Sequence, residues 1–281
     1  MRSKRLVDNT KAVLNKYGIT ASKRFGQNFV TDPSVLEDIV RASQISKEEN
    51  ALEIGPGLGT LTEFLAERAG KVVAVEVDKS LIPVLKDTLR HYDNIEIINA
   101  DILKLDILSV MGKEAFRIIA NLPYYITTPI LMSLLESRIP CRSITVMVQK
   151  EVGERMTAVP GSKSYGALTL AVNYYTTASI VRKVPAECFL PQPKVDSVVV
   201  HLDIRNDIEN RVKNEELMFS LIRGAFNQRR KTLVNALNGY AGLNIPKDRL
   251  TEAVQSIGAK PSVRGEELSL DDFSRLADVL S

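Results

Sequence analysis

The chain has 281 residues, 44% apolar and 25% charged, which is typical of a soluble globular protein with two domains. No apolar run is long enough to span a membrane and no signal peptide is recognisable, so we expect a cytoplasmic protein. Two histidines, and two cysteines without metal-ligand spacing, argue against zinc chemistry and histidine catalysis, and we expect no metal.

The net charge of +3 is unevenly distributed along the chain. Residues 1–30 contain seven basic side chains and one acid, a net charge of +6, so the remainder of the chain sums to −3. A basic N-terminal arm suggests contact with phosphates, and Lys23 and Arg24 are candidate phosphate contacts within it. A solvated terminus that binds nothing would carry the same charges.

Helical patterns and short apolar strands alternate over the first two thirds of the chain. The first clear helix is capped by Asp32 and opened by Pro33, and a later one over 60–70 is closed by Gly70. The alternation predicts an α/β fold with an open sheet of parallel strands. The predicted strands lie in the segments NALEI, KVVAVEVD, IEIINAD, FRIIANL, SITVMVQK and the second half of FLPQPKVDSVVVHLDI.

The last quarter of the chain has a different character, with helical patterns and no strand. We expect helices over 215–237, 247–258 and 269–280, the last with a capping box formed by Ser269 and Asp272. A small helical domain is therefore predicted over 208–281, joined to the preceding domain near 205–213.

A glycine-rich segment, Gly55-Pro56-Gly57-Leu58-Gly59, follows a strand and opens a helix, as in nucleotide-binding loops. Glycines let the backbone approach a ligand closely, and a helix N-terminus offers unpaired N–H groups. Glu76, which ends the next strand, could accept both hydroxyls of a ribose. Asp101, after the third strand, could accept from an adenine amine. This set predicts an adenosine-containing ligand without choosing between NAD and S-adenosylmethionine.

Two features favour S-adenosylmethionine. The G-x-G-x-G spacing differs from the pyrophosphate fingerprint, and Pro56 removes one N–H from the loop. The fourth strand ends in Asn121-Leu122-Pro123-Tyr124, which suits methylation of an adenine amine better than hydride transfer. Because the lone pair of that amine is delocalised, two fixed acceptors, the Asn121 side-chain oxygen and the Leu122 carbonyl, would concentrate electron density on the nitrogen. Pro123 keeps Leu122 out of helical angles and Tyr124 offers a stacking face.

A simpler interpretation of this motif stays open. Asn121 could cap the following turn, with Pro123 and Tyr124 as ordinary loop residues. The position of the motif, one strand after Asp101, favours the catalytic interpretation.

The segments KRFGQNFVTD, LEIGPGLGTLT, NLPYYITTPIL and FLPQPKVDSV occur in the order typical of rRNA adenine dimethyltransferases, which the chain resembles over about 23–237. AFNQRRKTLVNAL, the long N-terminal leader and RGEELSLDDFSRLA resemble the small-subunit branch rather than the macrolide-resistance methylases. The resemblance implies a cofactor lid within 1–30. It also implies a Rossmann-like class I methyltransferase sheet over 31–207 and an rRNA-contacting helical domain over 208–281.

The resemblance also implies roles for individual residues. Phe189 would be a second aromatic face that sandwiches a flipped base opposite Tyr124, although a core role for Phe189 is the alternative. Val30 stands where the family usually has leucine. Cofactor contacts are expected at Asn28, Val30, Gly55, Gly57, Glu76, Asp101 and Asn121. Phosphate contacts are expected from Arg223, Arg229, Arg230 and Lys231, which we place on a helix and which a solvated helix face would explain equally well.

These observations lead to a specific expected function. With S-adenosylmethionine as cofactor, the chain would dimethylate N6 of two adjacent adenines in the 3′-terminal hairpin of 16S rRNA, during biogenesis of the small ribosomal subunit. We expect it to act as a monomer, without a membrane. The alternatives are a macrolide-resistance methylase of large-subunit rRNA, a non-catalytic rRNA-binding assembly factor on the same fold and, third, a nicotinamide dehydrogenase.

Overall fold

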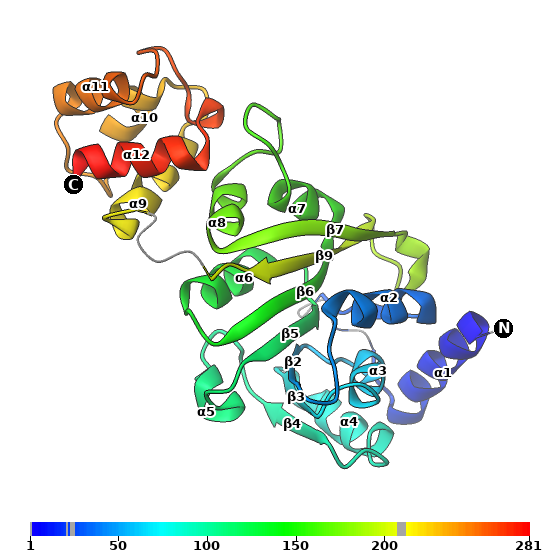
Figure 1. The fold of residues 1–281 in the computed structure, drawn as a ribbon. Helices are drawn as coiled ribbons and strands as arrows, with labels where there is room; N and C mark the ends of the chain where they lie inside the picture. Colours follow the sequence, from blue (N-terminus) through cyan, green and yellow to red (C-terminus); the bar gives the residue numbers. More distant parts are fainter. Residues whose placement is uncertain (1, 21, 23–25, 207–211) are drawn as a thin grey trace. The chain divides into compact units, whose positions relative to one another are not determined.

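The computed structural model describes residues 2–20, 22, 26–206 and 212–281, with the backbone alone for 2–8 (Figure 1). The chain divides into two compact units. The sheet unit comprises Met1–Gly153 and Ala178–Ile204, and the helical unit comprises Glu154–Thr177 and Arg205–Ser281. The largest difference from the segments predicted from the sequence is that 154–177 groups with the C-terminal helices; the arm 1–30 belongs to the sheet unit, and the helical unit resumes at Arg205 rather than at 208.

Within the described residues, seven strands form the main sheet in the order β4-β3-β2-β5-β6-β9-β7. The strands from β4 to β6 in this order are parallel, as predicted, and β9 is antiparallel to β6. Strands of mostly buried Val, Ile and Ala are typical of parallel sheets that are covered on both faces. The strands are β2 (Asn50–Ile54), β3 (Lys71–Glu76), β4 (Ile95–Asn99), β5 (Phe116–Asn121), β6 (Cys141–Gln149), β7 (Thr176–Val184) and β9 (Ser197–Ile204).

All six predicted strands are confirmed, and one further strand of the main sheet was not predicted. This strand, β7, lies at the edge of the sheet next to β9. Its sequence TTASIVRKV has buried residues at its two ends and exposed or half-buried residues between them. Its sequence therefore lacks the apolar pattern by which the other strands were recognised, including β4 at the opposite edge.

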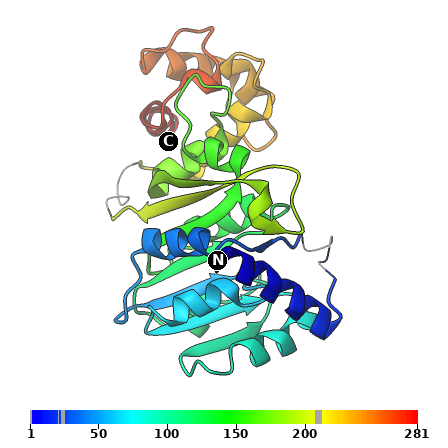
Figure 2. The same ribbon diagram turned by 90° about the vertical axis from the view of Figure 1, so that its right-hand side faces the viewer.

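Helices cover both faces of the sheet: Figure 1 shows α2 and α3 on one side and α5 and α6 on the other, and in Figure 2 α1 to α3 lie in front. The helix capped by Asp32 is confirmed, since the Asp32 carboxylate accepts from the Ser34 N–H at 2.9 Å. The predicted end at Gly70 is wrong: α3 ends at Ala66, and the Gly70 N–H donates to the Glu49 carbonyl. The helices are α1 (Arg2–Tyr17), α2 (Pro33–Ser43), α3 (Thr60–Ala66), α4 (Ile82–Thr88), α5 (Ile107–Met111), α6 (Thr127–Glu136) and, crossing into the helical unit, α7 (Lys150–Met156).

The N-terminal arm contains a helix, α1, that packs against the sheet unit. Val13, Leu14 and Tyr17 join an apolar cluster that includes Phe29 and Leu58 of the site described below. Lys16 forms an ion pair of 2.6 Å with Asp87 of α4, and the Tyr17 hydroxyl donates to the same carboxylate. Lys23 and Arg24, the two predicted RNA contacts of the arm, lie outside the described residues.

The helical unit contains α8 (Ala167–Tyr175), α9 (Glu215–Asn227), α10 (Leu233–Asn238), α11 (Lys247–Ser256) and α12 (Leu270–Leu280). The capping box of α12 is confirmed, because Ser269 and Asp272 exchange hydrogen bonds. Tyr174 and Tyr175 of α8 both donate their hydroxyls to Glu215, at 3.0 and 2.7 Å, and their rings contact Phe219. These aromatic contacts explain why 154–177 groups with the C-terminal helices.

The helix predicted over 215–237 is wrong in its middle, because Gln228–Lys231 form a turn between α9 and α10. Three tertiary contacts explain the break. The Leu233 N–H donates to the Val263 carbonyl at 2.7 Å, and the Arg229 guanidinium donates to the Lys163 carbonyl and to Glu266. The predicted phosphate contacts at 229–231 therefore lie on a turn.

Candidate functional site

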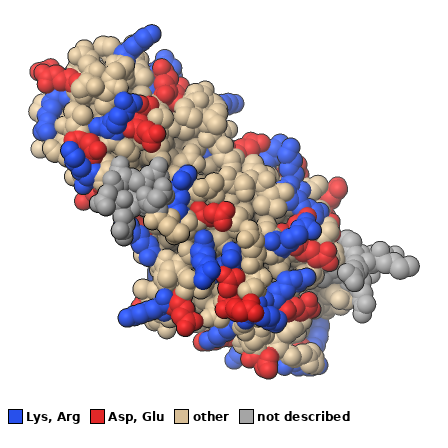
Figure 3. Space-filling view, in the orientation of Figure 1, with Lys and Arg blue, Asp and Glu red and all other residues tan. Residues whose placement is uncertain are grey.

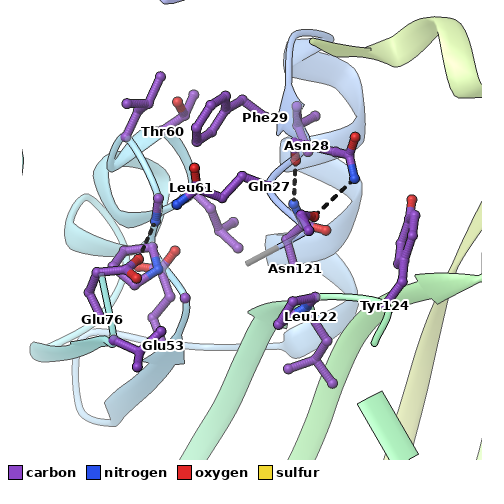
Figure 4. A pocket seen from close by; sticks show the side chains of 18 of the residues that line it. Gln27, Asn28, Phe29, Glu53, Thr60, Leu61, Glu76, Asn121, Leu122 and Tyr124 are labelled. Atoms are coloured by element: carbon purple, nitrogen blue, oxygen red, sulfur yellow. Dashed lines mark hydrogen bonds between the residues drawn. The ribbon is translucent and has the colours of Figure 1, made fainter. Parts of the chain in front are cut away.

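The predicted cofactor residues meet where the parallel strands of the sheet unit end. Asp101 lies in a second pocket, which shares Gly55, Val77, Pro123 and Tyr125 with the first. The two pockets are therefore adjacent and could hold different parts of one ligand. The first pocket is lined by the other six predicted residues, Asn28, Val30, Gly55, Gly57, Glu76 and Asn121 (Figure 4).

The glycine loop needs glycine for its conformation as well as for its closeness to the pocket. Gly55, Gly57 and Gly59 have φ angles of +70°, +60° and +86°, which L-residues with a side chain rarely adopt. A Cβ on Gly57 would also lie 3.2 Å from the ring of Phe29. At Gly55 and Gly57 the loop thus presents backbone without a side chain to the pocket.

Glu76 is a nearly buried carboxylate, 5% exposed, at the end of β3. Its Oε2 accepts from the Gly57 N–H at 3.2 Å and its Oε1 from the Asp78 N–H at 2.8 Å. Burial raises the pKa of Glu76, against the opposing effect of these two backbone donors. The carboxylate is therefore held in one place at the wall of the pocket.

Residues 26–30, here called the lid, border the same pocket. The Gln27 side-chain amide donates to Asp78 at 2.9 Å and accepts from the Ser22 N–H at 2.8 Å. Phe29 and Val30 form β1 (Phe29–Val30), a short strand antiparallel to β8 (Phe189–Leu190). Hydrogen bonds at one end and strand pairing at the other hold the lid against the sheet unit.

Asn121 ends β5 and is half-buried, and the lid determines how its side-chain amide is oriented. The Nδ2 group donates to the Asn28 carbonyl at 3.1 Å, a contact drawn in Figure 4. The flipped amide would place Oδ1 against that carbonyl, two acceptors without a proton between them. The nitrogen end is therefore engaged by the protein and the oxygen end stays available to a ligand.

The residues after Asn121 are fixed by hydrogen bonds to their neighbours. The Leu122 N–H donates to the Met147 carbonyl of β6 at 3.1 Å, and Thr127 donates its hydroxyl to the Pro123 carbonyl at 3.0 Å. Figure 4 shows Tyr124 standing beside Asn121, on the side away from Glu76. Burial raises the pKa of Tyr124, so its hydroxyl stays neutral.

Phe189 does not line either pocket described above. It is 4% exposed and belongs to the apolar core cluster that includes Val30, Leu36 and Ile39. The alternative that the sequence left open, a core role, therefore describes its position. The pairing of β8 with β1 explains this placement, because the register sets Phe189 opposite the buried Val30.

Among the lining residues that were not predicted as site residues from the sequence, Glu53 and Tyr125 carry groups that could act on a ligand. Glu53 of β2 is 1% exposed, and its Oε2 has no hydrogen-bond partner among the described residues. Burial raises its pKa to about 8, and the negative charge of Glu76 acts in the same direction. The sequence signal that could have identified Glu53 as a site residue is its position as a carboxylate within the apolar run NALEI. Tyr125, 54% exposed, lines both pockets, and a Cβ on Gly26 of the lid would lie 3.4 Å from its ring.

The predicted phosphate contacts of the helical unit are all exposed, but they differ in their partners. Arg229 is held by Glu266 at 2.9 Å, and Arg223 of α9 donates to the Ser220 hydroxyl. Arg230 and Lys231 line a pocket at the turn after α9. Figure 3 shows Lys and Arg side chains interspersed with Asp and Glu over the face in view, so charge alone does not mark an RNA surface.

Neither a membrane-spanning helix nor a metal-binding cluster is found in the described part of the chain. No helix there combines the length and apolar character needed to cross a membrane. The same residues contain no cluster of three or more His, Cys, Asp or Glu side chains suited to a metal ion.

Comparison with known proteins agrees with this geometry. The sequence profile for ribosomal RNA adenine dimethylase matches residues 18–280. "Ribosomal RNA small subunit methyltransferase A" of Lachnoclostridium phytofermentans is 52% identical over 276 residues, which cover 96% of this chain and 95% of that protein. A dimethyladenosine transferase from Plasmodium falciparum has a similar structure, with a TM-score of 0.74 and 29% identity over 88% of this chain and 95% of that one. The 23S rRNA methyltransferase ErmE follows, with a TM-score of 0.68 and 26% identity over 90% and 99% of the two chains.

The match of a dimethylase profile to nearly the whole chain, together with the Rossmann-like sheet and its helical C-terminal region, decides the assignment. The chain belongs to the ribosomal RNA adenine dimethylase family.

Proposed function

We propose that this chain dimethylates N6 of two adjacent adenines in the 3′-terminal hairpin of small-subunit rRNA, with S-adenosylmethionine as the methyl donor. Relatives called small subunit methyltransferase A, about half identical over nearly the full length, support the small subunit as the substrate. The single observation that carries the chemistry is the orientation of Asn121, whose amide nitrogen is engaged by the lid.

The cofactor would occupy both pockets of the sheet unit. Glu76 would accept the ribose hydroxyls and Asp101 the adenine amine, and the glycine loop would let the backbone approach closely. The unpaired Oε2 of Glu53 fits the ammonium group of a methionine, because a buried carboxylate without a partner gains most from a cation. When bound, S-adenosylmethionine supplies an electrophilic methyl group on a sulfonium.

Asn121, which ends β5, and the residues after it would act on the amine of the target adenine. Asn121 Oδ1 and the Leu122 carbonyl would each accept one N–H, which favours a tetrahedral nitrogen with its lone pair directed at the methyl group. Tyr124 would stack on the purine. The methylated nitrogen is acidic enough to lose its proton to water, so no strong base is needed. After the first transfer one N–H remains for the two acceptors.

The helical unit would contact rRNA phosphates, with the sheet unit carrying the chemistry. Arg223, Arg230 and Lys231 are the proposed contacts there, and Arg229 would have to exchange Glu266 for a phosphate. Lys23 and Arg24 of the basic arm are proposed to contribute in the same way. We further propose that the chain acts as a monomer in the cytoplasm. Replacing Arg230 and Lys231 by glutamine would reduce the salt dependence of rRNA binding by about 0.7 in log–log slope for each phosphate that the variant no longer neutralises.

The decisive experiment incubates the chain with methyl-labelled S-adenosylmethionine and purified, unmethylated small or large ribosomal subunits. We expect label in the small subunit, recovered as N6,N6-dimethyladenosine after nuclease digestion. Label in the large subunit alone would indicate a methylase of the macrolide-resistance type. A chain that binds small subunits but labels neither subunit would be an assembly factor, and NAD bound more tightly than S-adenosylmethionine in equilibrium dialysis would indicate a dehydrogenase.

A further inference from the structure

Ser197 is a buried residue of the FLPQPKVDSV motif to which the function described above gives no role. Its side chain is 0% exposed, and its Oγ lies 2.6 Å from the Tyr124 hydroxyl, a hydrogen-bond distance. Tyr124 and Asn121 line the same pocket, and Figure 4 shows the Tyr124 ring on the side of Asn121 that faces away from Glu76. The residue that would stack on the target base is thus tied to a serine 73 positions later in the chain.

The antiparallel direction of β9 explains how Ser197 reaches this place. The other strands from β4 to β6 run towards the pocket and end there, whereas β9 begins there, with Ser197 opposite Gln149 at the end of β6. On its other side β6 pairs with β5, where Asn121 lies opposite Met147. The first residue of β9 is therefore set two strands away from the end of β5, within reach of the side chain of Tyr124.

Ser197 is held more firmly than a loop residue would be. The Asp196 carbonyl accepts from the Lys150 N–H at 2.9 Å, and the Asp196 carboxylate accepts from the Ala186 N–H at 3.0 Å. Strand pairing holds Ser197 itself on the other side. A hydroxyl fixed in this way can orient a tyrosine ring, since the ring has only two side-chain torsions and the hydrogen bond restrains both.

We propose that Ser197 is a positioning residue for methyl transfer, whose hydroxyl holds the Tyr124 ring where a flipped adenine stacks with its amine at Asn121. The inference rests on the proposed function and adds a residue to it. Ser197 touches neither substrate nor cofactor and acts through Tyr124. Because phosphate contacts supply most of the affinity for RNA, loss of the hydroxyl should lower the rate in the bound complex rather than the affinity.

The test compares Ser197→Ala, Tyr124→Phe and the double variant, with kcat and KM measured on unmethylated small subunits. Each single variant should lower kcat about fivefold to tenfold, the range expected for one hydrogen bond, with KM for the subunit and the Kd for S-adenosylmethionine within about twofold. The double variant should be no slower than the worse single one, because both remove the same hydrogen bond. Ser197→Thr, which keeps the hydroxyl, should restore most of the rate.

A matched control separates positioning from a general loss of stability. Ser143 is 1% exposed, lies near the opposite end of β6 and accepts a hydrogen bond from Arg117 at 3.1 Å. Ser143→Ala should lower the melting temperature about as much as Ser197→Ala while leaving kcat unchanged. If Ser197→Ala fails to fold, Tyr124→Phe removes the same hydrogen bond without altering the core.

Three results would overturn the proposal: an unchanged kcat in the folded Ser197→Ala or Tyr124→Phe variant, losses that multiply in the double variant, or an equal loss in Ser143→Ala. A wild-type chain that labels no adenine would overturn the proposed function along with this inference. Wild-type methylation with an unaffected Ser197→Ala would overturn only the inference.

Discussion

The segment from the end of β5 to Tyr124 and the segment from Phe189 to the start of β9 both carry motifs that resemble those of the dimethylases, but they differ in where their side chains lie. Asn121 and Tyr124 of the first line the pocket. Phe189 and Ser197 of the second are buried, one in the apolar core and the other against the Tyr124 hydroxyl. The difference shows that a motif residue can support a ligand-contacting residue instead of touching the ligand.

The largest expected effect is on stability, at the buried motif residue Phe189. Phe189→Ala should lower the free energy of unfolding by about 3–5 kcal/mol, because it removes a buried ring from the core. Chemical denaturation would measure the loss. Phe189→Leu, which refills much of the space, should fold and methylate at close to the wild-type rate. A folded Phe189→Leu variant with a tenfold lower kcat would instead make Phe189 a base-contacting residue.

Asn121 tests the role of the motif residues that line the pocket. Asn121→Ala should lower kcat by about 10²–10³, or about 2.7–4 kcal/mol of transition-state stabilisation, with cofactor affinity in equilibrium dialysis largely kept. Asn94 is a matched control, because its amide also donates to a carbonyl, that of Ala66 at 2.9 Å, away from the pocket. Asn94→Ala should affect stability and not kcat. Equal losses of rate and cofactor affinity in Asn121→Ala would contradict the acceptor role.

The stacking role of Tyr124 can be tested by comparing alanine variants of Tyr124 and its neighbour Tyr125. Tyr124→Ala should cost about 1–3 kcal/mol in kcat/KM for the small subunit, the range for one base–aromatic stack. Tyr125 lines both pockets, and its replacement by alanine should lower kcat/KM for the small subunit by less than Tyr124→Ala does. The reverse order would assign the purine to Tyr125.

Glu53 is as buried as Phe189 but lines the pocket. It therefore tests whether a buried residue can contact the ligand as well as support the residues that do. The folded chain keeps the Glu53 proton up to about pH 8, whereas the unfolded chain releases it near 4.5. Its contribution to stability is therefore complete below pH 4.5 and is lost as the pH rises through 8. Over this window the free energy of unfolding should fall, by at most about 1.4 kcal/mol per pH unit.

Glu53→Gln should lack this decrease, which parallel denaturation curves at pH 5.5, 7 and 8.5 would reveal. The variant should also bind S-adenosylmethionine more weakly, since glutamine cannot lose a proton and pair with the ammonium group as Glu53 can. Identical pH dependence in both proteins would show that Glu53 is already ionised in the folded chain.

Much of the fold and most of the pocket could be predicted from the sequence, because the signals are local. Continuous apolar runs identified the buried strands, and glycines at fixed spacing marked a loop whose φ angles require them. Glu76, Asp101 and Asn121 could be placed together because parallel strands end at one edge of the sheet. Glu53 was missed, although a carboxylate inside an apolar strand is a visible signal.

The tertiary structure alone decided the features that depend on partners distant in sequence. The Asn121 amide is oriented by the Asn28 carbonyl, 93 residues earlier, and the break after α9 depends on contacts with Val263, Lys163 and Glu266. Local patterns record which side chains are apolar and how often they recur. They do not record which polar atom meets which, because that pairing exists only once the strands and the lid are packed together.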